Sequence, residues 1–234
     1  MQTAKLVLLF SVIISSFGIF TAIMLALAPP PAAAQTFRKP AAGSIFLLIC
    51  LLGILAAIRP KKCSKIFAFH SEADETDISG TPHKGLIIIG HHVNCEEFSS
   101  HVTSFFGRTY CAACAGLFLG ALAALISGVF YFFTDWTAGM SSFSFPAVST
   151  GTIFIVLGFA QLLFKGKMRM ALNTVFPFGA FLILAGMDAL AQNVFVDLYL
   201  TALTVLWIWT RILLSKWDHI RICGACKHAC SLRS

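Results

Sequence analysis

The sequence predicts an all-α membrane protein of about six transmembrane helices with a small cytoplasmic Cys/His module. Three observations support this fold class. Of the 234 residues, 58% are hydrophobic and only 12% are charged, which is more apolar surface than a soluble domain could bury. The basic residues stand between apolar segments, and the cysteines and histidines gather on one predicted side. The lipid bilayer is therefore the expected solvent for most of the chain.

The predicted spans follow from length and composition. A spanning helix needs about 20 predominantly apolar residues, because about 30 Å of hydrocarbon is crossed at about 1.5 Å per residue. Six segments meet or approach this length, and they run from Leu6 to Ala28, Ala42 to Ile58, Tyr110 to Phe133, Ala147 to Phe164, Met170 to Leu190 and Val194 to Leu214. The second and fourth are short, and Pro177 is expected to kink the fifth.

These spans divide the chain into four parts. They are two N-terminal transmembrane helices (1–58), a cytoplasmic loop with a Cys/His cluster (59–109), a four-helix transmembrane region (110–214) and a cytoplasmic Cys/His-rich tail (215–234). Within the loop, the segment from His101 to Tyr110 alternates in polarity and turns at Gly107, which predicts a short β-hairpin.

The 17 basic residues are distributed unevenly between the two sides of the predicted bilayer. With the amino terminus inside, the inside connections hold Lys5, six residues from Arg59 to Arg108, three from Lys165 to Arg169 and five from Arg211 to Arg233. The outside connections hold only Arg38 and Lys39. Because Lys and Arg accumulate in cytoplasmic loops, we expect a cell-membrane protein with both termini in the cytoplasm. Topology explains the net charge of +7 better than a nucleic-acid partner does.

The first span could instead be a cleaved signal peptide. Lys5 precedes an apolar run, and Ala32, Ala33 and Ala34 offer small residues for cleavage. The run is longer than the usual core of about 7 to 15 residues, which favours an uncleaved helix. Cleavage would leave five spans with the same sidedness.

The third span carries a small residue at every fourth position, namely Gly116, Gly120, Ala124 and Gly128. Such a stripe permits close approach of another helix backbone. Packing within the chain is the favoured interpretation, and a homodimer contact through Gly116 and Gly120 is the alternative.

All cysteines except Cys50, and all seven histidines, fall on the cytoplasmic side or at its membrane edge. Two thiolates separated by two residues can bind one ion, because the turn between them brings both sulfurs to one side. Cys111 and Cys114 form such a pair at the mouth of the third span. A four-ligand site would be completed by Cys95 and one of His91, His92 or His101. Zinc is preferred to an iron–sulfur cluster, because histidines are abundant and the usual cluster spacing is absent.

A second cluster follows the sixth span and comprises His219, Cys223, Cys226, His228 and Cys230. It holds enough ligands for a metal site of its own. Alternatively, its Cys-x-x-Cys pair joins Cys111 and Cys114 in one four-thiolate site. A third interpretation is a basic tail whose thiols stay free or become acylated near the membrane.

The stretch from His92 to Gly120 contains Cys95, Phe98, His101 and Gly107, followed by Cys111-Ala112-Ala113-Cys114-Ala115-Gly116. It resembles an uncharacterised prokaryotic family of small membrane proteins defined by a domain of unknown function. Members of that family share a Cys upstream of Cys-Ala-x-Cys-x-Gly-x-x-x-Gly at the start of a membrane helix. The resemblance implies one coherent site and no particular reaction.

Three functional classes are compatible with these features of the sequence. The leading hypothesis is a membrane protein with a structural or regulatory zinc module, whose ion orders the connection between the second and third spans. The enzyme alternative is thiol–disulfide exchange, because Cys111 and Cys114 lie where a helix amino terminus lowers a thiol pKa. Transport of a metal or small solute is disfavoured by the scarcity of intramembrane ionisable residues. Asp188 and Asp197 are expected to be interfacial.

Overall fold

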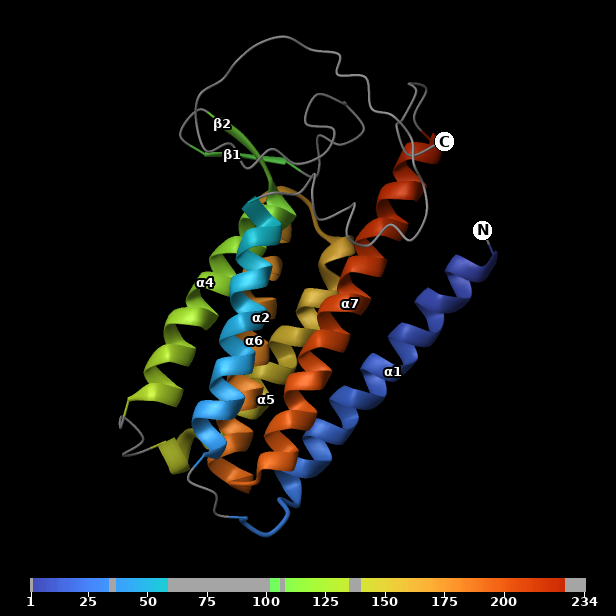
Figure 1. The fold of residues 1–234 in the computed structure, drawn as a ribbon. Coiled ribbons are helices and arrows are strands. Elements are labelled where there is room, and N and C mark those ends of the chain that lie inside the picture. The colour runs from blue at the N-terminus through green and yellow to red at the C-terminus, as the bar shows by residue number, and fades with distance from the viewer. Residues whose placement is uncertain (1, 34–36, 59–101, 106–107, 135–139, 226–234) are drawn as a thin grey trace.

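The computed structural model describes residues 2–33, 37–58, 102–105, 108–134 and 140–225 (Figure 1). Its six long helices are α1 (Gln2–Leu27), α2 (Arg38–Ile58), α4 (Ala112–Phe133), α5 (Met140–Phe159), α6 (Gly166–Ala191) and α7 (Val194–Ala225). A 3-10 turn, η2 (Ala160–Leu163), follows α5, and the strands β1 (Val102–Phe105) and β2 (Arg108–Cys111) form an antiparallel hairpin. All six helices are long and apolar enough to cross a membrane, which confirms the predicted multi-pass, all-α membrane fold.

The start of α1, the β-hairpin and the end of α7 lie at one end of the bundle (Figure 1). We call this the hairpin end, and it includes Cys111 and Asp218. The other end, which we call the turn end, includes Arg38 and Gln192. Large apolar side chains on the outside of the bundle are exposed, as expected where lipid replaces water as the solvent.

Two helices differ from their predicted bounds. The helix α5 begins at Met140 and continues through Pro146, where the predicted span started only after the proline. A bundle tolerates such a proline, because neighbouring groups can satisfy the backbone carbonyl that it frees. The helix α7 extends to Ala225, well beyond the predicted end at Leu214. Residues 215–223 are more polar, but they contain neither glycine nor proline, so the helix continues after the apolar segment ends.

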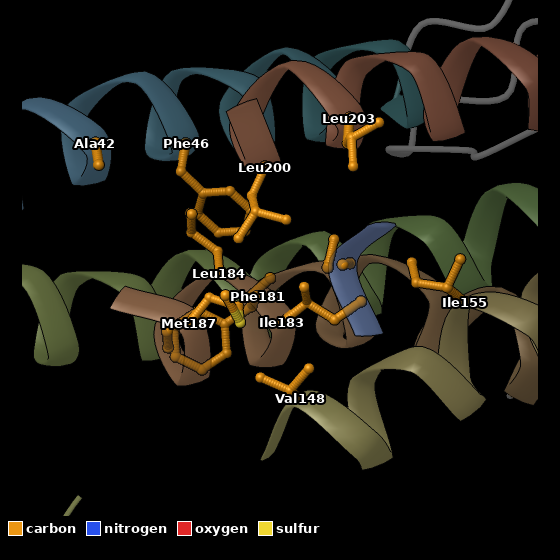
Figure 2. Packing of buried hydrophobic residues seen from close by; sticks show 14 of the residues in the cluster. Ala42, Phe46, Val148, Ile155, Phe181, Ile183, Leu184, Met187, Leu200 and Leu203 are labelled. Atoms are coloured by element: carbon orange, nitrogen blue, oxygen red, sulfur yellow. The ribbon is translucent and has the colours of Figure 1, made fainter. Parts of the chain in front are cut away.

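The helix α6 is the centre of the bundle. In its apolar segment 61% of the residues are buried, against 22% in α1. Phe181, Ile183, Leu184 and Met187 of α6 lie among buried side chains from the surrounding helices (Figure 2). The helices α4 and α5 pack directly on α6, whereas α2 packs mainly on α4 and α1 mainly on α7.

The predicted small-residue stripe of α4 is occupied within the chain. A Cβ atom at Gly116 would collide with the Met170 carbonyl oxygen, and one at Gly120 would collide with the Thr174 carbonyl oxygen, both in α6. Farther along α4, a Cβ atom at Gly128 would lie 2.9 Å from Leu47 of α2. A second copy of the chain could not use the face of Gly116 and Gly120 while α6 covers it.

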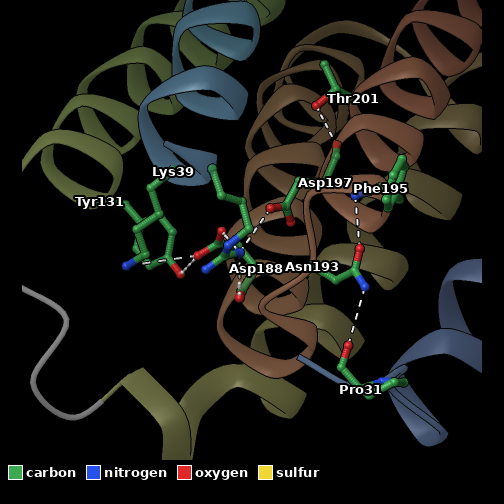
Figure 3. Close-up of polar contacts among 9 residues, drawn as sticks. Pro31, Lys39, Tyr131, Asp188, Asn193, Phe195, Asp197 and Thr201 are labelled. Carbon is green, nitrogen blue, oxygen red and sulfur yellow. Dashed lines mark hydrogen bonds and ion pairs between the residues drawn. The ribbon is translucent and has the colours of Figure 1, made fainter. Parts of the chain in front are cut away.

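A two-residue turn joins α6 to α7. Gln192 adopts a left-handed conformation with φ 45°, and its N–H donates to the Asp188 carbonyl oxygen at 3.1 Å, which ends α6. The Asn193 side-chain oxygen then accepts the N–H of Phe195 at 3.0 Å, an N-cap that starts α7 (Figure 3). The two helices are therefore tightly antiparallel neighbours at the turn end.

The helix α1 lies at the edge of the bundle and contacts α7 through hydrogen bonds. The Ser15 and Thr210 hydroxyls are 2.8 Å apart, and the Trp207 indole N–H donates to the Ser15 carbonyl oxygen at 3.2 Å. Interhelical hydrogen bonds of this kind contribute about 0.6 to 2 kcal/mol in membranes. They fix the register of α1 although most of its surface is exposed to lipid.

Replacing Gly120 by Ala should destabilise the protein by about 1 to 3 kcal/mol, because the new methyl group meets the Thr174 carbonyl and lies 2.9 Å from Pro177 Cδ. Gly53→Ala is the matched control, since its nearest neighbour would be Ala121 Cβ at 3.9 Å. Thermal unfolding of both variants in detergent micelles measures the difference. Equal melting temperatures would contradict the close α4–α6 contact.

Candidate thiolate site and its buried polar surroundings

The thiol pair predicted from the sequence lies where the β-hairpin meets α4. Cys111 is the last residue of β2 and pairs with Val102 across the hairpin, while Cys114 follows in the first turn of α4. Neither cysteine forms a disulfide bond, and both are half-buried. Because Gly116 has no side chain, the first turns of α4 lie directly against α6. The thiol pair is therefore held next to the most buried helix of the bundle.

The surroundings of Cys111 favour the thiolate form. The hydrogen bond from the Cys114 thiol has the largest influence on its pKa, and burial opposes it. The backbone N–H groups of Cys114 and Ala113 and the positive charge of Arg169 act in the same direction as the thiol, and together they lower the pKa of Cys111 to about 6. A thiolate at neutral pH is both the form that binds metal ions and the form that attacks disulfides.

The remaining predicted ligands are not all placed by the structure. His91, His92, Cys95, His101, Cys226, His228 and Cys230 lie outside the described residues. His219 and Cys223 lie in the last turns of α7, at the same end of the bundle as Cys111. Within the described ranges, no three or more Cys, His, Asp or Glu residues form a group that could hold a metal. Cys50 is buried in the apolar core of α2, away from the thiol pair, as the sequence predicted.

Two buried arginines, Arg169 and Arg211, lie toward the same end of the bundle as the thiol pair. Arg169 of α6 donates to the Asp218 carboxylate of α7 at 3.3 Å, and Arg221 donates to the second carboxylate oxygen of Asp218 at 3.2 Å. Arg211 of α7 donates to the side-chain oxygens of Asn173 and, at 3.3 Å, of Gln161. From the sequence, both arginines were counted only as loop charges, and these buried contacts of theirs were not predicted.

A second polar cluster lies at the turn end, between α2, α4, α6 and α7 (Figure 3). Arg38 donates to the carboxylates of Asp188 and Asp197, the latter at 2.9 Å, and to the Asp188 carbonyl oxygen at 3.1 Å. The Tyr131 hydroxyl donates to Asp188 at 2.7 Å. Lys39 lies 4.0 Å from the same carboxylate and 4.9 Å from the centre of the Tyr131 ring. The formal charges of the two basic and two acidic side chains in this cluster sum to zero.

Asp188 and Asp197 lie near the end of α6 and the start of α7, where the sequence places them, but their burial in protein was not predicted. Both side chains are 0% exposed. Their burial is stabilised because each accepts a hydrogen bond from Arg38, which belongs to a distant part of the sequence. One signal could have indicated this. Arg38 and Lys39 are the only basic residues predicted on that side, and a buried acid needs a cationic or hydrogen-bonding partner.

Comparison with protein-family models, with curated proteins and with solved structures finds no match. The resemblance of residues 92–120 to a membrane family with a Cys-x-x-Cys signature therefore stays a prediction. The functional interpretation depends on the chemistry of the site alone.

Replacing Arg38 by Met should destabilise the protein by about 3 to 5 kcal/mol, because two buried carboxylates lose their shared cation. Lys39→Met is the matched control and should cost less than about 1 kcal/mol, since Lys39 is 31% exposed and only approaches Asp188. Unfolding in mixed micelles with increasing SDS measures both values. A similar loss in the two variants would show that the Arg38 pairs have no special role.

Proposed function

We propose that this chain is a cell-membrane protein whose hairpin end faces the cytoplasm and carries a structural or regulatory zinc-binding Cys/His module. The observation that supports the proposal is the thiol pair of Cys111 and Cys114, fixed at the start of α4 with a Cys111 pKa lowered to about 6. Two thiols that form no disulfide, one with its pKa lowered to about 6, are suitable ligands for a soft divalent metal.

The other ligands come from the flanking segments in this proposal. Cys95 and one of His91, His92 or His101 complete the coordination of the first site. His219, Cys223, Cys226, His228 and Cys230 either form a second site or contribute Cys223 and Cys226 to the first. The end of α7 supports both arrangements, because it lies at the hairpin end with the thiol pair. Zinc is preferred to an iron–sulfur cluster, because the available histidines suit zinc.

Such an ion would organise the connection between α2 and α4. Zinc contributes about 10 to 16 kcal/mol to the folding of small metal modules, which is enough to order a segment that has little apolar core. Because the thiol pair lies on α4, the ordered module would be attached to the helix bundle. Binding or release of zinc could then change a surface on the cytoplasmic side.

Thiol–disulfide exchange is the second candidate. A lowered pKa of the first cysteine in a Cys-x-x-Cys pair, at a helix amino terminus, is also typical of thiol oxidoreductases. The additional cysteines and histidines of the chain favour metal. Transport of a metal or solute has the least support, because the charged residues of the described helices lie near the two ends of the bundle and not at mid-membrane.

The orientation is supported by charge. Fifteen of the 17 basic residues lie at the hairpin end or in the segments that connect there, whereas Arg38 and Lys39 lie at the turn end. This distribution also accounts for the net charge without a nucleic-acid partner. A homodimer, if the chain forms one, would use a face other than that of Gly116 and Gly120, which α6 covers.

The orientation predicts that single cysteines introduced between α4 and α5, at positions 134–139 of a chain that lacks the native cysteines, react with an impermeant maleimide in intact cells. A cysteine retained at position 230 should react only after the cells are permeabilised. Labelling of the two positions in the same cells measures this. The opposite pattern would place the thiol pair outside and remove the reducing compartment on which the metal site depends.

The zinc proposal predicts about one zinc ion per chain if the two clusters share a site and about two if they do not, at distances of about 2.0 to 2.3 Å. Cys111→Ser or Cys114→Ser should remove one ion, whereas Cys50→Ser, the matched control in the apolar core, should remove none. Elemental analysis and X-ray absorption of protein purified without chelators measure metal content and ligand type.

Metal-free wild-type protein would contradict the zinc proposal. If alkylation trapping of that protein also shows Cys111 and Cys114 cycling between dithiol and disulfide, thiol exchange replaces metal binding as the function. Trapped thiols that are always reduced and protected by metal would rule out that alternative.

A further inference from the structure

Arg211 is a buried cation without a carboxylate partner among the described residues. Its side chain is 5% exposed and lies in α7, near the hairpin end. Its guanidinium donates to the side-chain oxygens of Gln161 and Asn173, which are neutral, and its Nε has no hydrogen-bond partner. Neutral amides satisfy some of its hydrogen bonds but do not balance its charge.

The neighbouring carboxylate does not supply that balance. Asp218, which is 2% exposed, binds the buried Arg169 and the more exposed Arg221. In the described part of this end, the buried charges are thus Arg169 and Arg211 against Asp218, an excess of one positive charge. A buried charge is costly unless an opposite charge lies close to it.

The thiol pair lies where the missing negative charge is needed. Asn173, which accepts the hydrogen bond from Arg211, packs directly beneath α4: a Cβ atom at Gly116 would lie 2.7 Å from Asn173 Cβ. Gly116 is two residues after Cys114. The Cys111–Cys114 pair therefore lies at the end of α4 that packs over the contact between Asn173 and Arg211.

We infer that Arg211 is a positioning residue for the thiol pair, and that it acts as the buried counter-cation of a negatively charged Cys111–Cys114 site. The inference rests on the proposed function, because it treats the pair as a ligand set that carries negative charge. Thiolate groups in the pair carry negative charge, which offsets the excess positive charge of the described buried groups at this end. Arg211 would then connect the site on α4 to the packing of α6 and α7.

The first test measures the electrostatic potential at the thiols and does not require metal. Metal-free, full-length protein in detergent is alkylated with iodoacetate, which is anionic, or with iodoacetamide, which is neutral. Mass spectrometry gives the rate at Cys111 and Cys114 for each reagent. The ratio of the iodoacetate rate to the iodoacetamide rate reports the local charge. Both rates are proportional to the fraction of thiolate, so that fraction cancels. Arg211→Gln should lower this ratio at least about threefold.

Two further variants complete that test. Arg211→Lys keeps the positive charge and should retain most of the ratio. Lys216→Gln removes an exposed charge from the same helix and should leave the ratio unchanged. An unchanged ratio in folded Arg211→Gln protein would overturn the inference.

The second test measures zinc affinity by competition with a chromophoric chelator. Arg211→Gln should weaken binding by about tenfold, as expected when a supporting partner of a metal site is lost. If that variant does not fold, Asn173→Asp replaces it, because the new carboxylate pairs with Arg211 without a change in side-chain size. That variant should keep or raise the melting temperature and still weaken zinc binding. Unchanged zinc affinity in Asn173→Asp would show that Arg211 only joins the helices.

The two tests separate this inference from the zinc proposal. A wild-type protein that binds no zinc but shows the lower rate ratio in Arg211→Gln would refute zinc and support the counter-cation. A wild-type protein that binds zinc, with neither ratio nor affinity changed in Arg211→Gln, would refute the counter-cation and support zinc.

Discussion

Close backbone contact between α6 and its two neighbours sets the arrangement of all six helices. In lipid there is no hydrophobic force to bring apolar helices together, so association depends on packing and on polar contacts. Glycines remove the side chains that would keep the backbones apart: Gly116 and Gly120 of α4 lie against α6, and Gly151 of α5 faces Gly179 of α6. The remaining helices then pack around this three-helix unit.

The polar residues of the bundle are placed at its two ends, and the ends differ in charge balance. At the turn end, Arg38 and Lys39 balance Asp188 and Asp197, which explains how two acids can be fully buried there. At the hairpin end, the described buried groups carry one excess positive charge beside a pair of thiols. The first cluster contains as many basic as acidic side chains and joins α2, α4, α6 and α7. The second gains a counter-charge only when the thiols carry negative charge.

Sequence reasoning succeeded where a local property determines the structure. Apolar length gave the six spans, and the alternation before Cys111 gave the β-hairpin. It failed where the determining partner is distant in sequence. Nothing close to Asp188 reveals that Arg38 covers it, because the pair is 150 residues apart. Arg211 was counted as a loop charge for the same reason, since its partners lie in η2 and α6. Of the predicted metal ligands, the structure describes the side chains of only Cys111 and Cys114, so the full ligand set stays a prediction.

The short α6–α7 turn brings together two acids that need the same partner. Only Gln192 and Asn193 separate α6 from α7, so Asp188 and Asp197 lie close to each other on either side of the turn. An acid at the centre of a bilayer costs roughly 2.5 to 3.5 kcal/mol, so a helical hairpin with two unpaired acids is a poor membrane segment by itself. Arg38 belongs to α2, which precedes α6 and α7 in the chain. Because the ribosome makes the chain in that order, the cation that both acids need is synthesised before either of them.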